Sequence, residues 1–374
     1  MRIAFVTNFC PFYRVKLFQR LARRHDVTFL FFSDASEKNW ESLNPIGAGT
    51  LPVVPLHSGH AGKVRVLCRL VHQLWSQPYD VIIQGISGRF VVPLSYLIAR
   101  LRDRKFILWT GFWNHPSTLF HRLSFPLVRY LYRHADACVA YGSHVKEYLV
   151  SLGVDESRVF IAWNTADNEV YSRPVSDSDS AALKESLGIT SRKVVLFVGR
   201  LEPEKGLDIL LRAVSRFETK PAVLVIGRGS QKETLSAFCQ SHQLDSVAFL
   251  DYVPNTELYR YYHIADVVVV PSITTPLFKE PWGLIVNEAM NQGCPVIASD
   301  AVGAARGGLL EDGKNGLVVP ERDDELLAAA LTRVLDDPDF HQNLSLSARG
   351  TISSWTYDRM AQGFFDALQF VKPE

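Results

Sequence analysis

Short runs of β-branched and aliphatic residues alternate along this chain with segments whose apolar residues recur every three or four positions. In the first part of the chain the predicted strands are RIAFVTN, VTFLFF, YDVIIQG, KFILWTG and ACVAYG. Helical patterns follow several of them, among them VKLFQRLARR, FVVPLSYLIARLR and SHVKEYLVSLG. Strands that alternate with helices are typical of βαβ units, in which a parallel sheet is covered on both faces.

A second series of the same kind begins after the polar stretch SRPVSDSDSAA, which we expect to connect two domains. Its predicted strands are KVVLFVG, AVLVIG, SVAFLDYV, DVVVVPS, CPVIASD and NGLVVP, with helices between them. A chain of 374 residues is also longer than one hydrophobic core usually serves. The sequence therefore predicts an α/β protein with two doubly wound, Rossmann-like domains, over residues 1–170 and 171–374.

Polar residues directly after the strands of the second domain are the first candidates for a site, because ligands of open parallel sheets bind beyond the carboxyl ends of the strands. After KVVLFV come Gly199, Arg200 and, six residues after Gly199, Lys205. A glycine lets the backbone approach a ligand closely, and a guanidinium and an ammonium can converge on a diphosphate. The alternative is that Glu202 and Glu204 simply neutralise the two cations.

A two-glycine turn, Gly227-Arg228-Gly229-Ser230, follows the predicted strand AVLVI. Such a turn can contact a phosphate or a base. A tight connection of this kind is also needed in any doubly wound domain, so both interpretations stay open.

The stretch KEPWGLIVNEAM places Glu280 before a predicted helix and Glu288 within it. The helix GLIVNEAMNQ is expected to end at Gly293. Its start, at Pro281, Trp282 and Gly283, offers backbone N–H groups to an anion. Glu288 would be costly to bury among apolar residues unless a partner such as a ribose diol donates hydrogen bonds to it.

The composition is that of a globular protein, with 47% hydrophobic and 21% charged residues. The net charge is only +1, but residues 1–170 hold 20 Lys and Arg against 12 Asp and Glu, while the rest of the chain holds 20 against 27. This asymmetry indicates an anionic partner for the first half, such as a phosphorylated acceptor or a membrane surface, unless it reflects only uneven solvated faces.

Other patterns narrow the class of protein. No run of 18 apolar residues could span a bilayer, and MRIAFVTNF is too short and too soon polar for a signal peptide, so we expect a cytoplasmic protein. Five scattered cysteines without a CxxC pair argue against a disulfide framework and a zinc site. The near-neutral charge and the lack of a known binding module argue against a nucleic-acid role.

Together these residues resemble the retaining GT-B glycosyltransferases of glycosyltransferase family 4. The resemblance covers nearly the whole chain. In the second domain it is carried by VGRLEPEKGLDILL, by LDYVPNTELYRYYHIADVVVVPS, by the Glu280 to Glu288 element and by GCPVIASDAVGAARGGLLEDGKNGLVVP. In the first domain it continues through PFYRVKLFQRLARRHDVTFLFF, through ACVAYGSHVKEYLVSLGV and through NTAD at 164–167, where the family usually has NGVD.

The resemblance implies that the second domain holds a nucleotide-diphosphate sugar, that the first holds an acceptor, and that the sugar is transferred with retained configuration and without a metal. Arg200 and Lys205 would neutralise the diphosphate, Glu288 would bind the ribose and Glu280 the donor sugar. Further donor contacts would come from Gly199, Gly227, Val253, Gly283 and Leu284. No cofactor is implied, and the last helix, at about 355–374, would pack back on the first domain.

The chain departs from the family pattern in two places. The turn after the first strand is Thr7-Asn8-Phe9-Cys10-Pro11 instead of paired glycines. A catalytic histidine often ends the strand that matches KFILWT, whereas His115 comes several residues later. It can contact the donor sugar or assist catalysis, or it can simply pack in its loop.

The acceptor side is expected near Phe12, Tyr13 and Arg14, which follow the first strand, although these residues also suit the packing of a helix start. The segment LFHRLSFPLVRYLYRH joins aromatic and aliphatic residues to three arginines, a pattern that resembles a peripheral membrane contact but also occurs in protein cores. We therefore predict transfer of a hexosyl group to a glycan or a lipid-linked glycan. Alternatives are a nucleotide-sugar epimerase or hydrolase of the same fold and a non-catalytic nucleotide-sugar-binding protein.

Overall fold

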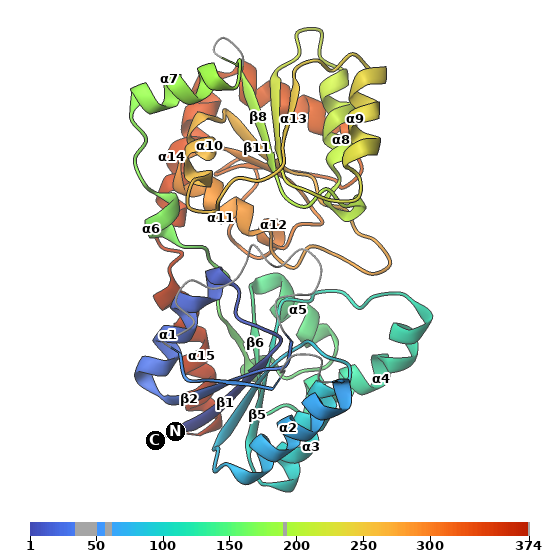
Figure 1. The fold of residues 1–374 in the computed structure, drawn as a ribbon, viewed down its shortest axis with the longest axis vertical. Coiled ribbons are helices and arrows are strands. Elements are labelled where there is room, and N and C mark those ends of the chain that lie inside the picture. The colour runs from blue at the N-terminus through green and yellow to red at the C-terminus, as the bar shows by residue number, and fades with distance from the viewer. Residues whose placement is uncertain (34–50, 57–61, 190–192, 373–374) are drawn as a thin grey trace. The chain divides into compact units, whose positions relative to one another are not determined.

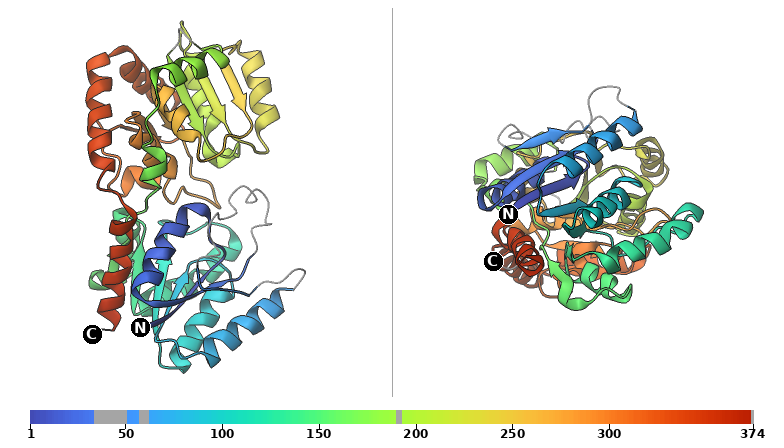
Figure 2. Two further views of the ribbon diagram at one scale, coloured as in Figure 1. Left: turned by 60° about the vertical axis from the view of Figure 1, so that its left-hand side comes forward. Right: turned by 90° about the horizontal axis from the view of Figure 1, so that it is seen from below.

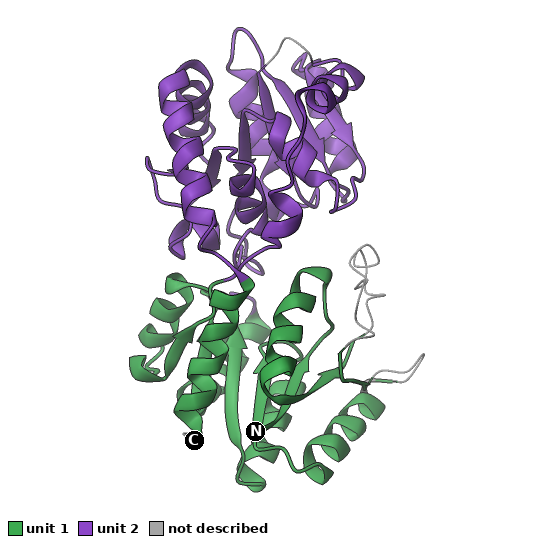
Figure 3. Cartoon of the chain, turned by 90° about the vertical axis from the view of Figure 1, so that its left-hand side faces the viewer, with its two compact units in different colours: residues 1–115, 119–163, 357–374 green, residues 116–118, 164–356 purple. Residues whose placement is uncertain are grey.

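The computed structural model describes residues 1–33, 51–56, 62–189 and 193–372. These residues form two compact units, which Figure 3 colours separately. Unit 1 comprises residues 1–115, 119–163 and 357–374, and unit 2 comprises residues 116–118 and 164–356. The chain thus returns to unit 1 for its last helix.

Unit 1 is built on a sheet of seven parallel strands in the order β3-β2-β1-β4-β5-β6-β7 (Figure 1). The strands are β1 Arg2–Thr7, β2 Asp26–Phe31, β3 Val53–Pro55, β4 Val81–Gly85, β5 Lys105–Thr110, β6 Ala137–Ala140 and β7 Val159–Ile161. The helices are η1 Phe12–Arg14, α1 Val15–Arg24, α2 Lys63–Ser76, α3 Val91–Leu101, α4 Leu119–His134, α5 Ser143–Ser151, η4 Glu156–Arg158 and α15 Tyr357–Val371.

Helices cover both faces of this sheet. On one face α1 and α15 pack against the strands, and Phe5, Phe18 and Phe364 are buried between them; Figure 2 shows the two helices side by side. On the other face α2, α3, α4 and α5 bury a second set of strand residues, including Ile82 and Phe106. Because successive strand residues point to opposite faces, strands covered on both sides are apolar throughout, as the sequence pattern indicates.

Unit 2 contains six parallel strands in the order β10-β9-β8-β11-β12-β13. They are β8 Val194–Val198, β9 Ala222–Ile226, β10 Val247–Leu250, β11 Val267–Val270, β12 Val296–Ser299 and β13 Leu317–Val319. Its helices are α6 Asn168–Tyr171, α7 Asp177–Ser186, η5 Pro203–Lys205, α8 Leu207–Ser215, α9 Lys232–Ser241, α10 Leu258–Ile264, α11 Leu284–Asn291, α12 Gly303–Arg306, α13 Asp324–Asp336 and α14 Pro338–Ile352.

The predicted fold class, two doubly wound α/β domains, is confirmed, with two local differences. The edge strands β3 and β7 were not predicted, because three residues are too few to show an alternating or apolar run. The polar stretch expected to connect the domains instead contains helix α7, which Ser176 caps by accepting a hydrogen bond from the Asp179 N–H. Among the described helices, none combines the length and the apolar character that crossing a bilayer requires.

Candidate functional site

The strand order of unit 2 defines where a ligand is expected. From the middle of the sheet, the strands β8, β9 and β10 follow one another toward one edge, and β11, β12 and β13 follow one another toward the other edge. The strand order therefore reverses between β8 and β11. In doubly wound sheets, ligands bind beyond the carboxyl ends of the strands at this reversal. The two loops that matter most are therefore those after β8 and β11.

The loop after β8 carries both predicted cations. Arg200 pairs with Glu204, with 2.9 Å between Nη2 and Oε1, so one of the expected neutralising contacts is present. Glu202 instead accepts hydrogen bonds from the backbone N–H and the hydroxyl of Ser230, in the loop after β9. Lys205, at the end of η5, pairs with neither of these glutamates in the described contacts.

The Lys205 ammonium forms an ion pair with the Glu280 carboxylate, which lies 75 residues away in the loop after β11. Both side chains are largely buried, at 19% and 10% exposed. The hydroxyl of Ser272 lies 3.4 Å from the same carboxylate oxygen, and the Phe278 ring centroid lies 5.3 Å from the ammonium. The fold therefore brings one predicted cation and one predicted carboxylate together at the reversal point.

Backbone contacts hold these two loops in register. The Ile273 N–H donates to the Glu204 carbonyl at 2.9 Å. Gly206 has φ +65°, and a Cβ at this position would collide with the Pro271 carbonyl oxygen. A glycine is needed here because the backbones after β8 and β11 touch, which fixes Lys205 opposite Glu280.

The glycine turns after β8 and β9 are also in direct contact. Gly227 has φ +151°, and a Cβ there would collide with the Gly199 carbonyl oxygen. A Cβ at Gly229 would likewise meet the backbone of Leu201. Packing alone therefore accounts for these glycines. Val253 is buried, at 8% exposed, in the loop after the neighbouring strand β10.

Helix α11 begins beside Glu280. Gly283 is its N-cap residue, with φ +86°, and Leu284 is its first residue. The Trp282 indole N–H donates to the Asn287 Oδ1 at 2.7 Å, and the ring is 2% exposed. This buried hydrogen bond stabilises the first turn of the helix. The first N–H groups of a helix have no acceptor within the helix and attract anions. The predicted end of α11 is confirmed, since Gly293 follows it with φ +68°.

Glu288 is buried in α11, at 6% exposed, but its partner is the protein itself. The Tyr262 hydroxyl of α10 donates to Oε2 at 2.7 Å. Burial raises the pKa of Glu288 to about 7, while hydrogen bonds from Tyr262 and Tyr171 oppose the increase. This carboxylate therefore does not require a ligand to compensate its burial, because tyrosine hydroxyls already donate hydrogen bonds to it.

The predicted residues of unit 1 lie in packed surroundings. Arg14 is 4% exposed, with its guanidinium 5.0 Å from the Trp109 ring centroid and 5.1 Å from that of Tyr141. This favours the packing role of Arg14 over an acceptor contact. Phe12 and Tyr13, in the same turn, are partly exposed.

His115 is also held within its own loop. Its Nε2 lies 2.7 Å from the His121 carbonyl oxygen, and its ring packs 4.6 Å from that of Phe125. In the structure these contacts favour the packing alternative for His115.

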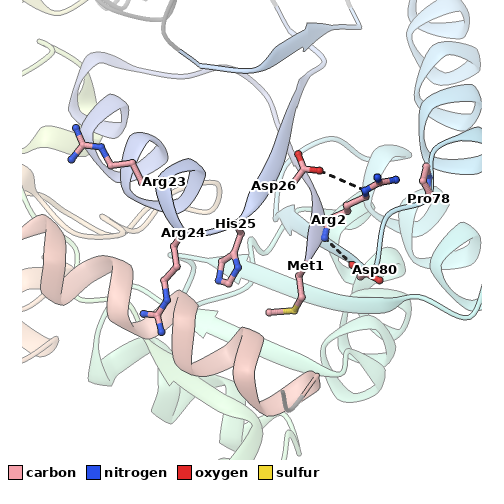
Figure 4. A pocket seen from close by; sticks show the side chains of 8 residues that line it. All are labelled: Met1, Arg2, Arg23, Arg24, His25, Asp26, Pro78 and Asp80. Atoms are coloured by element: carbon pink, nitrogen blue, oxygen red, sulfur yellow. Dashed lines mark hydrogen bonds and ion pairs between the residues drawn. The ribbon is translucent and has the colours of Figure 1, made fainter.

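A hollow of about 500 Å³ lies at the amino ends of β1 and β2, which is the end of the unit 1 sheet opposite to the carboxyl ends of its strands (Figure 4). Arg2 there contacts Asp26 at 3.6 Å through its side chain and Asp80 at 2.8 Å through its backbone N–H. This end of a parallel sheet is not where ligands of such folds bind. No cluster of three or more His, Cys, Asp or Glu residues suited to a metal ion occurs in the described part of the chain.

Two such units define the GT-B fold. Anabaena HepE, solved in complex with UDP, matches with a TM-score of 0.81 at 19% identity, covering 99% of this chain and 100% of that one. WaaG, a glycosyltransferase involved in lipopolysaccharide biosynthesis, matches with a TM-score of 0.67 at 15% identity over 100% of both chains.

The sequence identifies the family. Residues 179–351 match the family model of the glycosyl transferases group 1, and residues 13–164 match that of the glycosyl transferase 4-like domain. The chain belongs to this glycosyltransferase family, as its motifs predict.

Curated relatives share part of the chain. An uncharacterized glycosyltransferase of Methanocaldococcus jannaschii is 31% identical over 227 residues, which are 58% of this chain and 56% of that protein. D-inositol 3-phosphate glycosyltransferase of Corynebacterium glutamicum is 35% identical over 198 residues, which are 49% of this chain and 44% of that protein. The chain thus spans about half the length of these relatives.

Two residues of the site were not predicted. Ser272 lies two residues after β11, at the end of the predicted strand DVVVVPS, so the rule that selected Gly199 and Arg200 would have selected it as well. Tyr262 lies inside a helix, where no local pattern indicates that its hydroxyl meets a carboxylate on α11.

Proposed function

We propose that the protein is a retaining glycosyltransferase that moves a hexosyl group from a nucleotide-diphosphate sugar to a hydroxyl of a glycan or lipid-linked glycan. The observation that carries this proposal is the Lys205–Glu280 ion pair at the β8/β11 reversal, beside the start of α11. Membership of a glycosyltransferase family supports the reaction, and the solved complex of HepE with UDP-glucose supports the class of donor.

In this proposal the diphosphate lies between the loop after β8 and the first turn of α11. Arg200 and Lys205 supply positive charge, and the N–H groups of Gly283 and Leu284 complete the anion site. Glu280 keeps the Lys205 ammonium in place and accepts hydrogen bonds from hydroxyls of the donor sugar. Glu288 accepts hydrogen bonds from the ribose.

The reaction breaks the bond between the anomeric carbon and the phosphate oxygen, and forms a bond from the acceptor oxygen to the same face of that carbon. The acceptor proton passes to the departing phosphate oxygen, so no covalent intermediate with the protein is needed. Negative charge grows on the phosphate as the bond breaks, and fixed cations next to it lower the barrier. Because Arg200 and Lys205 provide that charge, we propose that transfer needs no metal.

We propose that unit 1 binds the acceptor. Phe12 and Tyr13 are the candidates that keep exposed surface, and His115 stays a candidate for contact with the donor sugar. A role in cell-surface glycan assembly, at the cytoplasmic side of the membrane, is supported by fold neighbours such as WaaG, which is involved in lipopolysaccharide biosynthesis.

The test measures transfer of labelled sugar from UDP-, GDP- and ADP-hexoses into glycan and lipid extracts. Lys205→Ala and Glu280→Ala should each lower the rate about 10²-fold or more, as the loss of a transition-state contact does elsewhere. Arg200→Ala should also lower it. Arg212→Ala is the matched control, because Arg212 forms an exposed i,i+4 pair with Asp208 just as Arg200 does with Glu204; its rate should stay that of the parent.

The alternatives give different results in the same assay. Isomerised or hydrolysed sugar without acceptor would indicate an epimerase or a hydrolase, and binding without turnover would indicate a binding protein. An inverted anomeric configuration in the product, seen by NMR, would contradict retention. Loss of activity in EDTA would contradict metal independence.

A further inference from the structure

Helix α4 exposes a row of apolar side chains. Leu119 and Leu123 are 73% and 74% exposed, and Leu127 and Tyr130 are about half exposed. These residues are three or four positions apart, so they lie along one side of the helix. The opposite side of α4, which includes Val128 and Tyr132, packs against the core of unit 1.

Helix α3 runs beside α4 in the same direction. At their amino ends the Arg89 guanidinium lies 4.1 Å from the Phe120 ring centroid, and near their carboxyl ends Arg100 donates to the His134 carbonyl at 2.8 Å. Phe90, directly before α3, is 70% exposed and adds to the apolar surface. We call the exposed surface of these two helices the α3–α4 face; Figures 1 and 2 show α4 projecting from unit 1.

This face belongs to a strongly basic stretch of sequence. Residues 51–135 contain 11 Lys and Arg but only two Asp and Glu, and residues 104–135 contain no acidic residue. The α4 arginines Arg122, Arg129 and Arg133 are exposed next to the apolar row. A surface that is both apolar and positively charged suits a partner that offers an apolar interior below an anionic layer.

We propose that the α3–α4 face docks on the surface of an anionic lipid bilayer. Leu119, Leu123 and Leu127 enter the boundary between headgroups and acyl chains, and the arginines keep their guanidinium groups at the lipid phosphates. A second copy paired through the same face would set like charges against each other, which disfavours that occupant. The inference does not depend on the proposed transferase activity.

The test is flotation of the purified full-length chain with two kinds of vesicle. One consists of neutral phosphatidylcholine, and the other contains about 30% of the anionic lipid phosphatidylglycerol. We expect binding to the anionic vesicles to be about tenfold or more above binding to neutral ones, and to fall at high salt. Leu123→Glu and Arg122→Gln should each weaken it several-fold.

Matched controls lie on unit 2. Leu346→Glu changes a leucine of α14 that is 62% exposed, and Arg212→Gln changes an exposed arginine of α8; both should bind vesicles like the parent chain. Circular dichroism melting checks that all variants are folded. The proposal is overturned if anionic vesicles do not bind the chain, or if Leu123→Glu binds as the parent does. It is also overturned if light scattering shows a dimer that Leu123→Glu abolishes.

Discussion

At the scale of single residues, burial shifts the pKa of Glu288 strongly. Its pKa is raised from 4.5 to about 7, chiefly by burial. The folded protein therefore binds a proton at Glu288 more tightly than the unfolded chain does. By linkage, the contribution of Glu288 to stability is greatest below pH 4.5 and is lost as the pH rises to about 7.

Glu288→Gln should remove this dependence, because a neutral amide can accept the Tyr262 hydrogen bond without an ionisation cost. The variant should match the parent near pH 5 and exceed it near pH 8 by up to about 3 kcal/mol, since one pKa unit corresponds to about 1.4 kcal/mol. Denaturant unfolding of both proteins at several pH values measures the difference. A difference that stays constant from pH 5 to pH 8 would show that the carboxylate is not desolvated as described.

The sequence predicts which residues form the site better than it predicts which side chains surround them. The residues after the strands, such as Lys205 and Glu280, are found because strand ends are recognisable and because the motifs resemble a family. The tyrosine partner of Glu288 is not found, because side-chain contacts between α10 and α11 leave no local pattern. For the same reason the sequence offers packing as one of two alternatives for Arg14 but does not predict the aromatic rings that surround it.

At the scale of elements, the site depends on how closely neighbouring strand ends approach. The turns after β8 and β9 meet where Gly227 approaches the carbonyl oxygen of Gly199, and this contact leaves no room for a side chain at Gly227. The apolar runs predict these strands well, because a buried parallel strand needs apolar residues on both faces. The short edge strands β3 and β7 escape prediction, because few of their residues are fully buried.

Gly227→Ala should destabilise unit 2 by about 3 kcal/mol or more, because φ +151° is unfavourable for alanine and its Cβ would meet the Gly199 carbonyl. Gly350→Ala is the control: Gly350 lies in α14, and an added Cβ would meet no heavy atom within 4 Å beyond the backbone of its own helix and its chain neighbours, so alanine should be neutral or slightly stabilising. Thermal unfolding of the two variants measures both effects. Equal midpoints would show that the turn after β9 can move away from β8.

At the scale of the whole molecule, the chain is folded as two units that each have their own sheet and core. The last helix, α15, contributes Met360, Phe364 and Leu368 to the core of unit 1, although more than 190 residues of unit 2 precede it. The diphosphate part of the proposed donor site lies on unit 2, between the loop after β8 and the first turn of α11. Nucleotide binding is therefore a property that can be measured without knowing the acceptor.

The central claim is that a nucleoside diphosphate binds where the loops after β8 and β11 meet, with its charge balanced by Lys205. Isothermal titration of the full-length chain with UDP, GDP and ADP, repeated with Lys205→Ala, tests it most directly. We predict saturable one-to-one binding of at least one of these nucleotides, weakened about tenfold or more in Lys205→Ala, as expected for the loss of a charge-assisted contact. Equal affinity in the two proteins, or no binding of any of the three nucleotides, would contradict the account.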